Sequence, residues 1–195
     1  MPTATNILPR TRRRCRDGLA GAVVLLAASM VGPAGAVSPL AGTTSSVAAA
    51  APPDLHCAWS VAPGARAGGA VRLQFSLSNP GPRAVRVLAW GTPFEGWLSP
   101  YIVLERDGAA VPYAGASVKR GDPGRDEYLR IAPGGRRQVS IDLAQAFDLS
   151  RPGRYELQAR IVLNDVHAGA AASRPRSQHT PQPLDCQALE FTLPG

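Results

Sequence analysis

What the sequence lacks already limits the functions open to it. Its three histidines, His56, His167 and His179, have no second histidine four residues away, so the paired-histidine pattern of a helical zinc site is absent. The segment at residues 115–119 is GASVK. It has a glycine two residues before its serine but lacks the second glycine of a nucleophile elbow. We therefore predict that the protein is not an enzyme and that it holds no metal or other cofactor.

No apolar run is long enough to cross a bilayer, which takes roughly 20 residues. The longest run, residues 19–31, has 13 residues. It follows five arginines between positions 10 and 16 and precedes small residues that end in Ala34-Gly35-Ala36. This order is typical of a secretory signal peptide. We predict a signal peptide over residues 1–36, a secreted, periplasmic or cell-envelope location, and no membrane anchor after cleavage.

Cysteine is scarce, with three in the chain. Cys15 precedes the apolar run and would leave with the signal peptide, so that Cys57 and Cys186 remain as an even pair. In an oxidising compartment such a pair is expected to form a disulfide. Closing a loop of this length would stabilise the domain by about 4 to 5 kcal/mol in the chain-entropy model. The bond would also remove the mature thiols as nucleophiles.

The excess of positive charge shrinks once the signal peptide is set aside. The whole chain has 21 basic and 14 acidic residues and a formal charge of +7. Five of the basic residues and one acidic residue precede position 37, which leaves 16 and 13, a charge of +3. Arginines such as Arg72, Arg86, Arg130 and Arg160 are expected to lie singly on separate strands. We predict no nucleic-acid partner, because such a partner needs a continuous basic patch.

The chain divides into a leader and one domain. Residues 37–54 contain Ala, Ser, Thr, Gly and Pro with almost no large side chain. Because such a segment cannot bury enough apolar surface to offset its ordering entropy, we predict a flexible leader. We expect one domain over residues 55–195. Within it, residues 164–183 interrupt the apolar pattern with Ala, Ser, Pro and Gln, and we predict a mobile loop between the last two strands.

Alternation of apolar and polar residues dominates this domain. It occurs at residues 71–78, 138–143, 155–161 and 189–193, and shorter apolar runs occupy residues 85–90, 101–105 and 128–131. A period of two predicts strands with one buried face. No window of a dozen residues carries a helical stripe, although residues 143–147 suit a single helical turn. We predict an all-β fold, an antiparallel immunoglobulin-like β-sandwich of about seven to eight strands.

A series of short segments carries a family resemblance. The segment 87–96 is VLAWGTPFEG, and it is followed by VLERDG at 103–108, VPYAG at 111–115, VKRG at 118–121, IAPG at 131–134 and YEL at 155–157. Together they resemble the non-catalytic N-terminal β-sandwich of secreted peptidyl-Lys metalloendopeptidases of the deuterolysin (aspzincin) type, over residues 55–195. The resemblance implies a non-catalytic domain, because in those enzymes a following domain carries the zinc site.

Aromatic side chains crowd residues 90–101 and point to a binding loop. Apolar side chains presented by a loop can dominate the affinity for a protein partner. The predicted partner-binding residues are Gly91, Thr92, Pro93, Phe94, Glu95 and Trp97. For Phe94 and Trp97, contact with a partner and a place in the core are both open. Trp59 and Trp90 are expected in the core.

One exposed turn carries two further motifs. Arg120-Gly121-Asp122 matches a tripeptide that some adhesion receptors bind, and Asp122, Asp126 and Glu127 offer oxygen ligands for Ca²⁺. Three-residue matches arise often by chance, and the sequence has no twelve-residue calcium loop here. We interpret these residues as solvated turn charges.

Taken together, the sequence predicts a secreted, non-catalytic protein-binding or peptidase-modulating module. Its expected partner is a secreted peptidase or another extracytoplasmic protein. Two alternatives remain open. One is an extracytoplasmic hydrolase with an unrecognised site, which includes a metal-dependent one that uses His56, His167 or His179. The other is a structural cell-envelope protein with no discrete partner.

Overall fold

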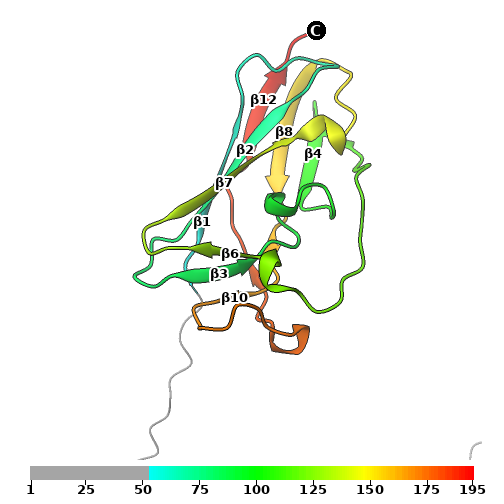
Figure 1. The fold of residues 1–195 in the computed structure, drawn as a ribbon. Coiled ribbons are helices and arrows are strands. Elements are labelled where there is room, and N and C mark those ends of the chain that lie inside the picture. Colours follow the sequence, from blue (N-terminus) through cyan, green and yellow to red (C-terminus); the bar gives the residue numbers. More distant parts are fainter. Residues whose placement is uncertain (1–52) are drawn as a thin grey trace, which may run out of the picture. The chain divides into compact units, whose positions relative to one another are not determined.

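The computed structural model describes residues 53–195, which form an all-β domain (Figure 1). The predicted signal peptide, and the predicted leader up to residue 52, lie outside the described residues. In the described part of the chain, none of the helices is long and apolar enough to span a membrane. The predicted fold class is confirmed, with twelve strands, several of them very short, in place of the expected seven to eight.

The first sheet contains β1 (His56–Val61), β2 (Arg72–Ser78) and β7 (Arg136–Asp142) in that order, all antiparallel. In the central strand β2, Leu73 and Phe75 are fully buried, while the residues next to them face outward. A strand with one face on the core requires this alternation, which is the pattern that predicted it.

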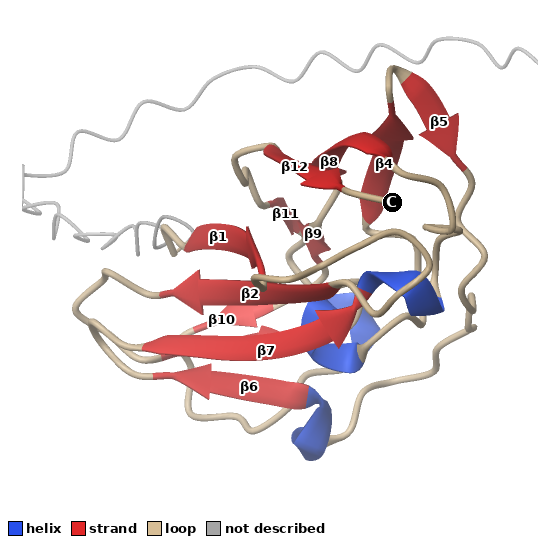
Figure 2. Cartoon of the chain, turned by 90° about the horizontal axis from the view of Figure 1, so that it is seen from above, coloured by secondary structure: helices blue, strands red, loops and turns tan. Residues whose placement is uncertain are grey.

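The second sheet contains β12 (Leu189–Leu193), β8 (Gly153–Ala159), β4 (Ile102–Arg106) and β5 (Ala109–Val111), again antiparallel. It forms a layer separate from β1, β2 and β7, as seen from above the domain (Figure 2). The central strand β8 buries Tyr155 completely. Two sheets of this kind leave one apolar face each, and those faces must pack together.

The strand order agrees with an immunoglobulin-like sandwich. The orders β1-β2-β7 and β12-β8-β4 correspond to strands A-B-E and G-F-C of that fold. The hydroxyl of Tyr155, near the start of β8, donates to the carbonyl of Arg151 at 2.6 Å. A tyrosine at this corner that bonds back to the backbone is a hallmark of the same sandwiches.

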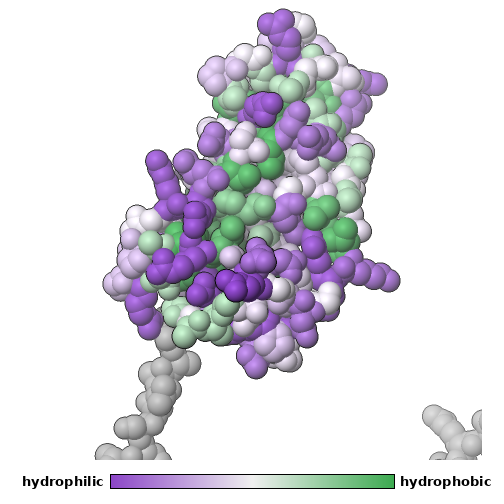
Figure 3. Space-filling view, viewed as in Figure 1, coloured by the Kyte–Doolittle hydropathy of each residue, from purple (hydrophilic) through white to green (hydrophobic). Residues whose placement is uncertain are grey.

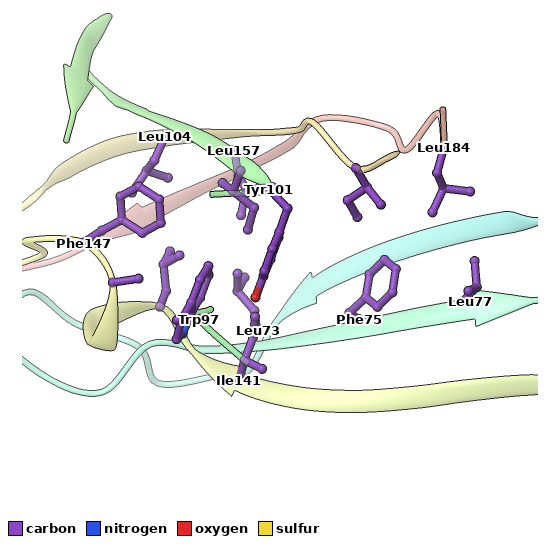
Figure 4. Close-up of a cluster of buried hydrophobic side chains, with 14 of the residues drawn as sticks. Leu73, Phe75, Leu77, Trp97, Tyr101, Leu104, Ile141, Phe147, Leu157 and Leu184 are labelled. Atoms are coloured by element: carbon purple, nitrogen blue, oxygen red, sulfur yellow. The ribbon is translucent and has the colours of Figure 1, made fainter. Parts of the chain in front are cut away.

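Apolar side chains from both sheets meet in one core (Figure 4). Leu104 and Leu157 of the second sheet face Leu73 and Ile141 of the first, and all four are buried. Full burial of one such side chain contributes about 1.5 to 3 kcal/mol. The core therefore supplies the main stabilisation of the sandwich.

Short strands at one end of the domain make a third sheet. It contains β10 (Val166–His167), β3 (Val85–Leu88) and β6 (Tyr128–Ile131), and a further pair joins β9 (Val162–Leu163) to β11 (Gln182–Pro183). The strands β9, β10 and β11 have two residues each, too few to show a period in the sequence. They account for most of the strands that the sequence did not predict.

The register of this sheet corrects one expectation. Arg86 and Arg130, expected to lie singly, are directly opposite each other on β3 and β6. His167 of β10 is opposite Arg86 on the other side. Residues directly opposite in an antiparallel pair share a face of the sheet. Three-dimensional pairing therefore gathers cations that are far apart in the sequence.

The predicted disulfide between Cys57 and Cys186 is confirmed, with the two Cα atoms 5.4 Å apart. It joins β1 to the segment that enters β12. The helical turn expected within residues 143–147 is present as η3 (Leu143–Gln145), which buries Leu143. The other short helical turns are η1 (Pro93–Glu95), η2 (Arg125–Glu127) and η4 (Arg176–Gln178).

Candidate functional site

The predicted partner-binding loop is a fixed turn built around η1. Thr92 is buried, donates its hydroxyl to the carbonyl of Ala89 at 2.6 Å, and accepts from the backbone N–H of Phe94 at 3.3 Å. Gly91 has φ of +70°, a conformation that L side chains rarely adopt. A Cβ atom there would also lie 3.2 Å from the Asn164 side chain. The backbone geometry of the loop therefore depends on both residues.

Glu95 holds this turn from within. Its side chain is 8% exposed. One carboxylate oxygen accepts from the Gly91 backbone N–H at 2.7 Å and from the Ser99 hydroxyl at 3.1 Å. The other accepts from Arg120 Nη2 at 2.5 Å. A buried carboxylate with this many donors is well satisfied, so Glu95 stabilises the loop.

The aromatic rings of the loop point inward. Trp97 is 8% exposed, donates its indole N–H to the carbonyl of Asp142 at 2.8 Å, and stacks on Tyr101 with ring centres 5.1 Å apart. Phe94 is half-buried and packs edge-to-face on Phe75 at 5.4 Å. Of the two roles left open for Trp97, the structure shows the core one, because little of its surface is left for a partner.

A polar hollow of about 300 Å³ lies beside the loop. We call it the loop hollow. Its lining includes Trp90, Glu95, Val118, Arg120, Arg176 and His179. The guanidinium carbon of Arg120 lies 5.2 Å from the centre of the Trp90 ring, a cation–π contact. Among the predicted loop residues, Gly91 and Glu95 are the two that line this hollow.

The Arg120-Gly121-Asp122 tripeptide is engaged within the domain. Arg120 pairs with Glu95, and its carbonyl accepts from Arg176 Nη1 at 2.9 Å. A carboxylate oxygen of Asp122 accepts from the backbone N–H of Arg176 at 2.9 Å. The tripeptide therefore connects its own turn to η4. Asp122 is a partner for that backbone rather than only a solvated charge.

A buried ion pair lies within residues 164–183. Asp165 is fully buried and pairs with Arg174 through both carboxylate oxygens. It also accepts from the Tyr128 hydroxyl at 2.7 Å and from the Thr180 backbone N–H at 3.2 Å. Burial raises the pKa of Asp165, but the hydrogen bonds from Arg174 and Tyr128 outweigh it and hold the pKa below its usual value.

The contact with Asp165 also changes the pKa of Tyr128. Burial and the hydrogen bond to Asp165 raise the pKa of Tyr128 to about 12. The hydroxyl is therefore protonated at neutral pH and acts as a donor to Asp165. A buried carboxylate needs such donors because an unpaired charge in the interior is costly.

Two of the three histidines flank Tyr128. The ring of His167 packs edge-to-face on the Tyr128 ring at 5.5 Å, and His179 Nε2 lies 3.4 Å from the Tyr128 hydroxyl. Burial, with the nearby charge of Arg174, lowers the pKa of His167. His56 lies apart on β1, 3.4 Å from Asp54. Across residues 53–195 no group of three or more metal-binding side chains comes together.

We call β3, β6, β10 and residues 164–183 the ion-paired end of the domain. Residues 164–183, predicted as a mobile loop, contain β10, η4 and β11. Their mobility stays a prediction. Asp165 could have been found from the sequence, because it lies between Leu163 and Val166, and a carboxylate beside buried aliphatic residues requires a partner. Its partner Arg174, nine residues on, gives no such signal.

Comparison with known proteins shows that part of the chain is similar in sequence to part of a protease. No family model matches it. It is 33% identical over 109 residues, 55% of its length, to a protein named extracellular protease from Aeromonas hydrophila. The matched part covers 31% of that relative, so the chain spans about a third of the relative's length. The chain is thus related to part of an extracellular protease, which agrees with the predicted export.

Proposed function

We propose that this chain is an exported, non-catalytic binding module that associates with an extracellular peptidase and modulates it. The single observation that carries the proposal is the 33% identity to part of an extracellular protease. The match covers a minority of that relative, as expected where the shared part is an accessory domain. The resemblance of residues 55–195 to the non-catalytic sandwich of deuterolysin-type enzymes, which rests on the sequence segments alone, implies the same role.

The loop hollow is the surface that suits this function best. It presents the guanidinium of Arg120, which lies over the buried ring of Trp90, on a turn fixed by the buried Glu95. Arginine is among the residues most enriched at the centres of protein interfaces. A rigid turn also limits the entropy lost when a partner binds. Val118, which is 42% exposed, lines the same hollow and adds an apolar contact.

The test is a binding titration with a defined probe. The exported chain, purified from culture medium, is titrated with the part of the Aeromonas hydrophila protease that lies outside the 109 matched residues. We expect a complex and a change in the rate of peptide hydrolysis. In Val118→Asp we expect affinity to fall about tenfold, equivalent to about 1.4 kcal/mol, because a charge would be buried beside Trp90.

Val103→Asp is the matched control. Val103 is similarly exposed, at 39%, but lies on β4 in the second sheet. This variant should bind as the wild type does. Absence of a complex would contradict the proposal, and equal weakening by both substitutions would remove the loop hollow as the binding surface.

A further inference from the structure

Two arginines and a histidine form a row across the sheet at the ion-paired end. His167, Arg86 and Arg130 are consecutive cross-strand neighbours on β10, β3 and β6. We call these three residues the basic row. Neighbouring strands lie about 4.8 Å apart, so the row spans roughly 10 Å. Hydrophilic side chains gather over β3 and β6 in the space-filling view (Figure 3).

No ion pair within the described domain accounts for the two arginines of the basic row. Within residues 53–195, no carboxylate lies within ion-pair distance of Arg86 or Arg130. A third arginine, Arg137 of β7, donates its Nε to the carbonyl of Arg130 at 3.0 Å and adds to the same charge. Like charges directly opposite each other destabilise a strand pair. Folding alone therefore gives no reason to place these side chains together.

The row ends at a second hollow, of about 680 Å³. We call it the proline hollow. Its lining includes Arg83, Val166, His167, Arg174, Pro181 and Pro183. His167 is 7% exposed, and its Nε2 atom is buried without a hydrogen-bond partner. Asp165 neutralises Arg174, which leaves Arg83 as a further cation beside apolar walls.

We propose that the basic row and the proline hollow bind an acidic segment of a partner protein. Carboxylates of the segment pair with Arg86 and Arg130, whose planar guanidinium groups match carboxylate geometry. Apolar side chains of the same segment enter between Pro181 and Pro183. This surface is separate from the loop hollow and does not require that the partner be a peptidase.

Size and composition favour a peptide over a nucleic acid. A nucleic-acid interface commonly neutralises about 6 to 10 phosphates, far more than a row of three residues can reach. The apolar lining from prolines and Val166 suits side chains of a peptide, whereas a sugar-phosphate backbone offers it little. An acidic peptide segment therefore satisfies both halves of the surface.

The experiment measures affinity for a fluorescent oligo-glutamate peptide, with an oligo-glutamine peptide of equal length as the reference ligand. The exported full chain should bind the first and not the second, and added salt should weaken the complex. The double variant Arg86→Gln with Arg130→Gln should bind roughly tenfold more weakly, because two charge contacts are lost. Arg160→Gln removes one exposed arginine elsewhere and should bind as the wild type does.

Folding does not confound this test. Removing two opposed like charges should leave the melting temperature unchanged or raise it, which a thermal scan checks. Equal affinity of the wild type and the double variant would overturn the proposal, as would the absence of binding. Tighter binding of a double-stranded DNA oligonucleotide than of the peptide would overturn it in favour of a phosphate polymer. Neither result depends on the peptidase titration, so the two proposals fail separately.

Discussion

Different forces stabilise two regions of this domain, the two-sheet body and the ion-paired end. The two-sheet body consists of the sheets β1-β2-β7 and β12-β8-β4-β5. In the body, fully buried side chains such as Phe75 and Leu157 pack between two sheets, and the stabilisation is apolar. At the ion-paired end, a buried carboxylate, Asp165, is held by Arg174 and Tyr128. Apolar side chains do not titrate, whereas the stability of a buried ion pair depends on pH through its carboxylate. The comparison therefore predicts that the two regions respond differently to substitution and to acid.

The largest expected effect comes from the body. Phe75→Ala deletes a fully buried ring that contacts both Trp59 and Phe94. We expect the free energy of unfolding to fall by about 4 kcal/mol, because transfer energy is lost and a cavity is left. Denaturant unfolding measures it, with Val103→Ala as the exposed control. A loss similar to that of the control would contradict the proposed core.

A smaller and more local effect is expected at the ion-paired end. Asp165→Asn leaves Arg174 without its charge partner, and breaking a buried pair of this kind costs about 3 kcal/mol. Amide hydrogen exchange should accelerate in residues 164–183 well before it does in β2 or β8. Uniform acceleration throughout the domain would show that the two regions unfold as one unit.

The mildest test uses pH. The pKa values of His167 and Asp165 are both lowered in the folded state, the first by burial and the charge of Arg174, the second by the bonds that outweigh its burial. An unfolded histidine takes up a proton below about pH 6.5, and the folded one resists it, so stability falls as the pH drops below that value. A second loss begins below about pH 4, where the unfolded Asp165 takes up a proton while the folded one keeps its charge, and it continues until the pH falls through the lowered folded pKa.

The matched variants are His167→Gln and His56→Gln. The first should flatten the decline in unfolding free energy between pH 7 and pH 5, because the buried imidazole is gone. The second substitutes an exposed histidine on β1 and serves as the control. If the unfolding free energy of the wild type and of both variants fell equally between pH 7 and pH 5, His167 would be excluded as the titrating group.

The sequence predicts the body far better than the ion-paired end. Strand β2 was expected over residues 71–78 and occupies Arg72–Ser78, because alternation is a local property of the chain. The disulfide follows from the cysteine count and the compartment. By contrast, the pairing of Arg86 with Arg130 depends on strand register, which residues 44 positions apart cannot reveal. The same holds for Arg120 and Glu95, which meet only once η1 and the turn are folded.

The aromatic loop shows a second limit of the sequence. Periodicity does not tell whether Trp97 faces a partner or the core, and the hydrogen bond to Asp142 that decides it comes from a distant strand. The predicted loop therefore contributes its backbone and Glu95 to the candidate site, while its large rings stabilise the fold.

Nuclear magnetic resonance mapping on the purified protein tests most directly whether binding belongs to the ion-paired end and its adjoining loop. Addition of the non-matching part of the Aeromonas hydrophila protease should shift amide signals around Trp90, Glu95 and Arg120. Signals from β4, β8 and β12 should stay in place. Shifts confined to the second sheet, or none at all, would contradict the account.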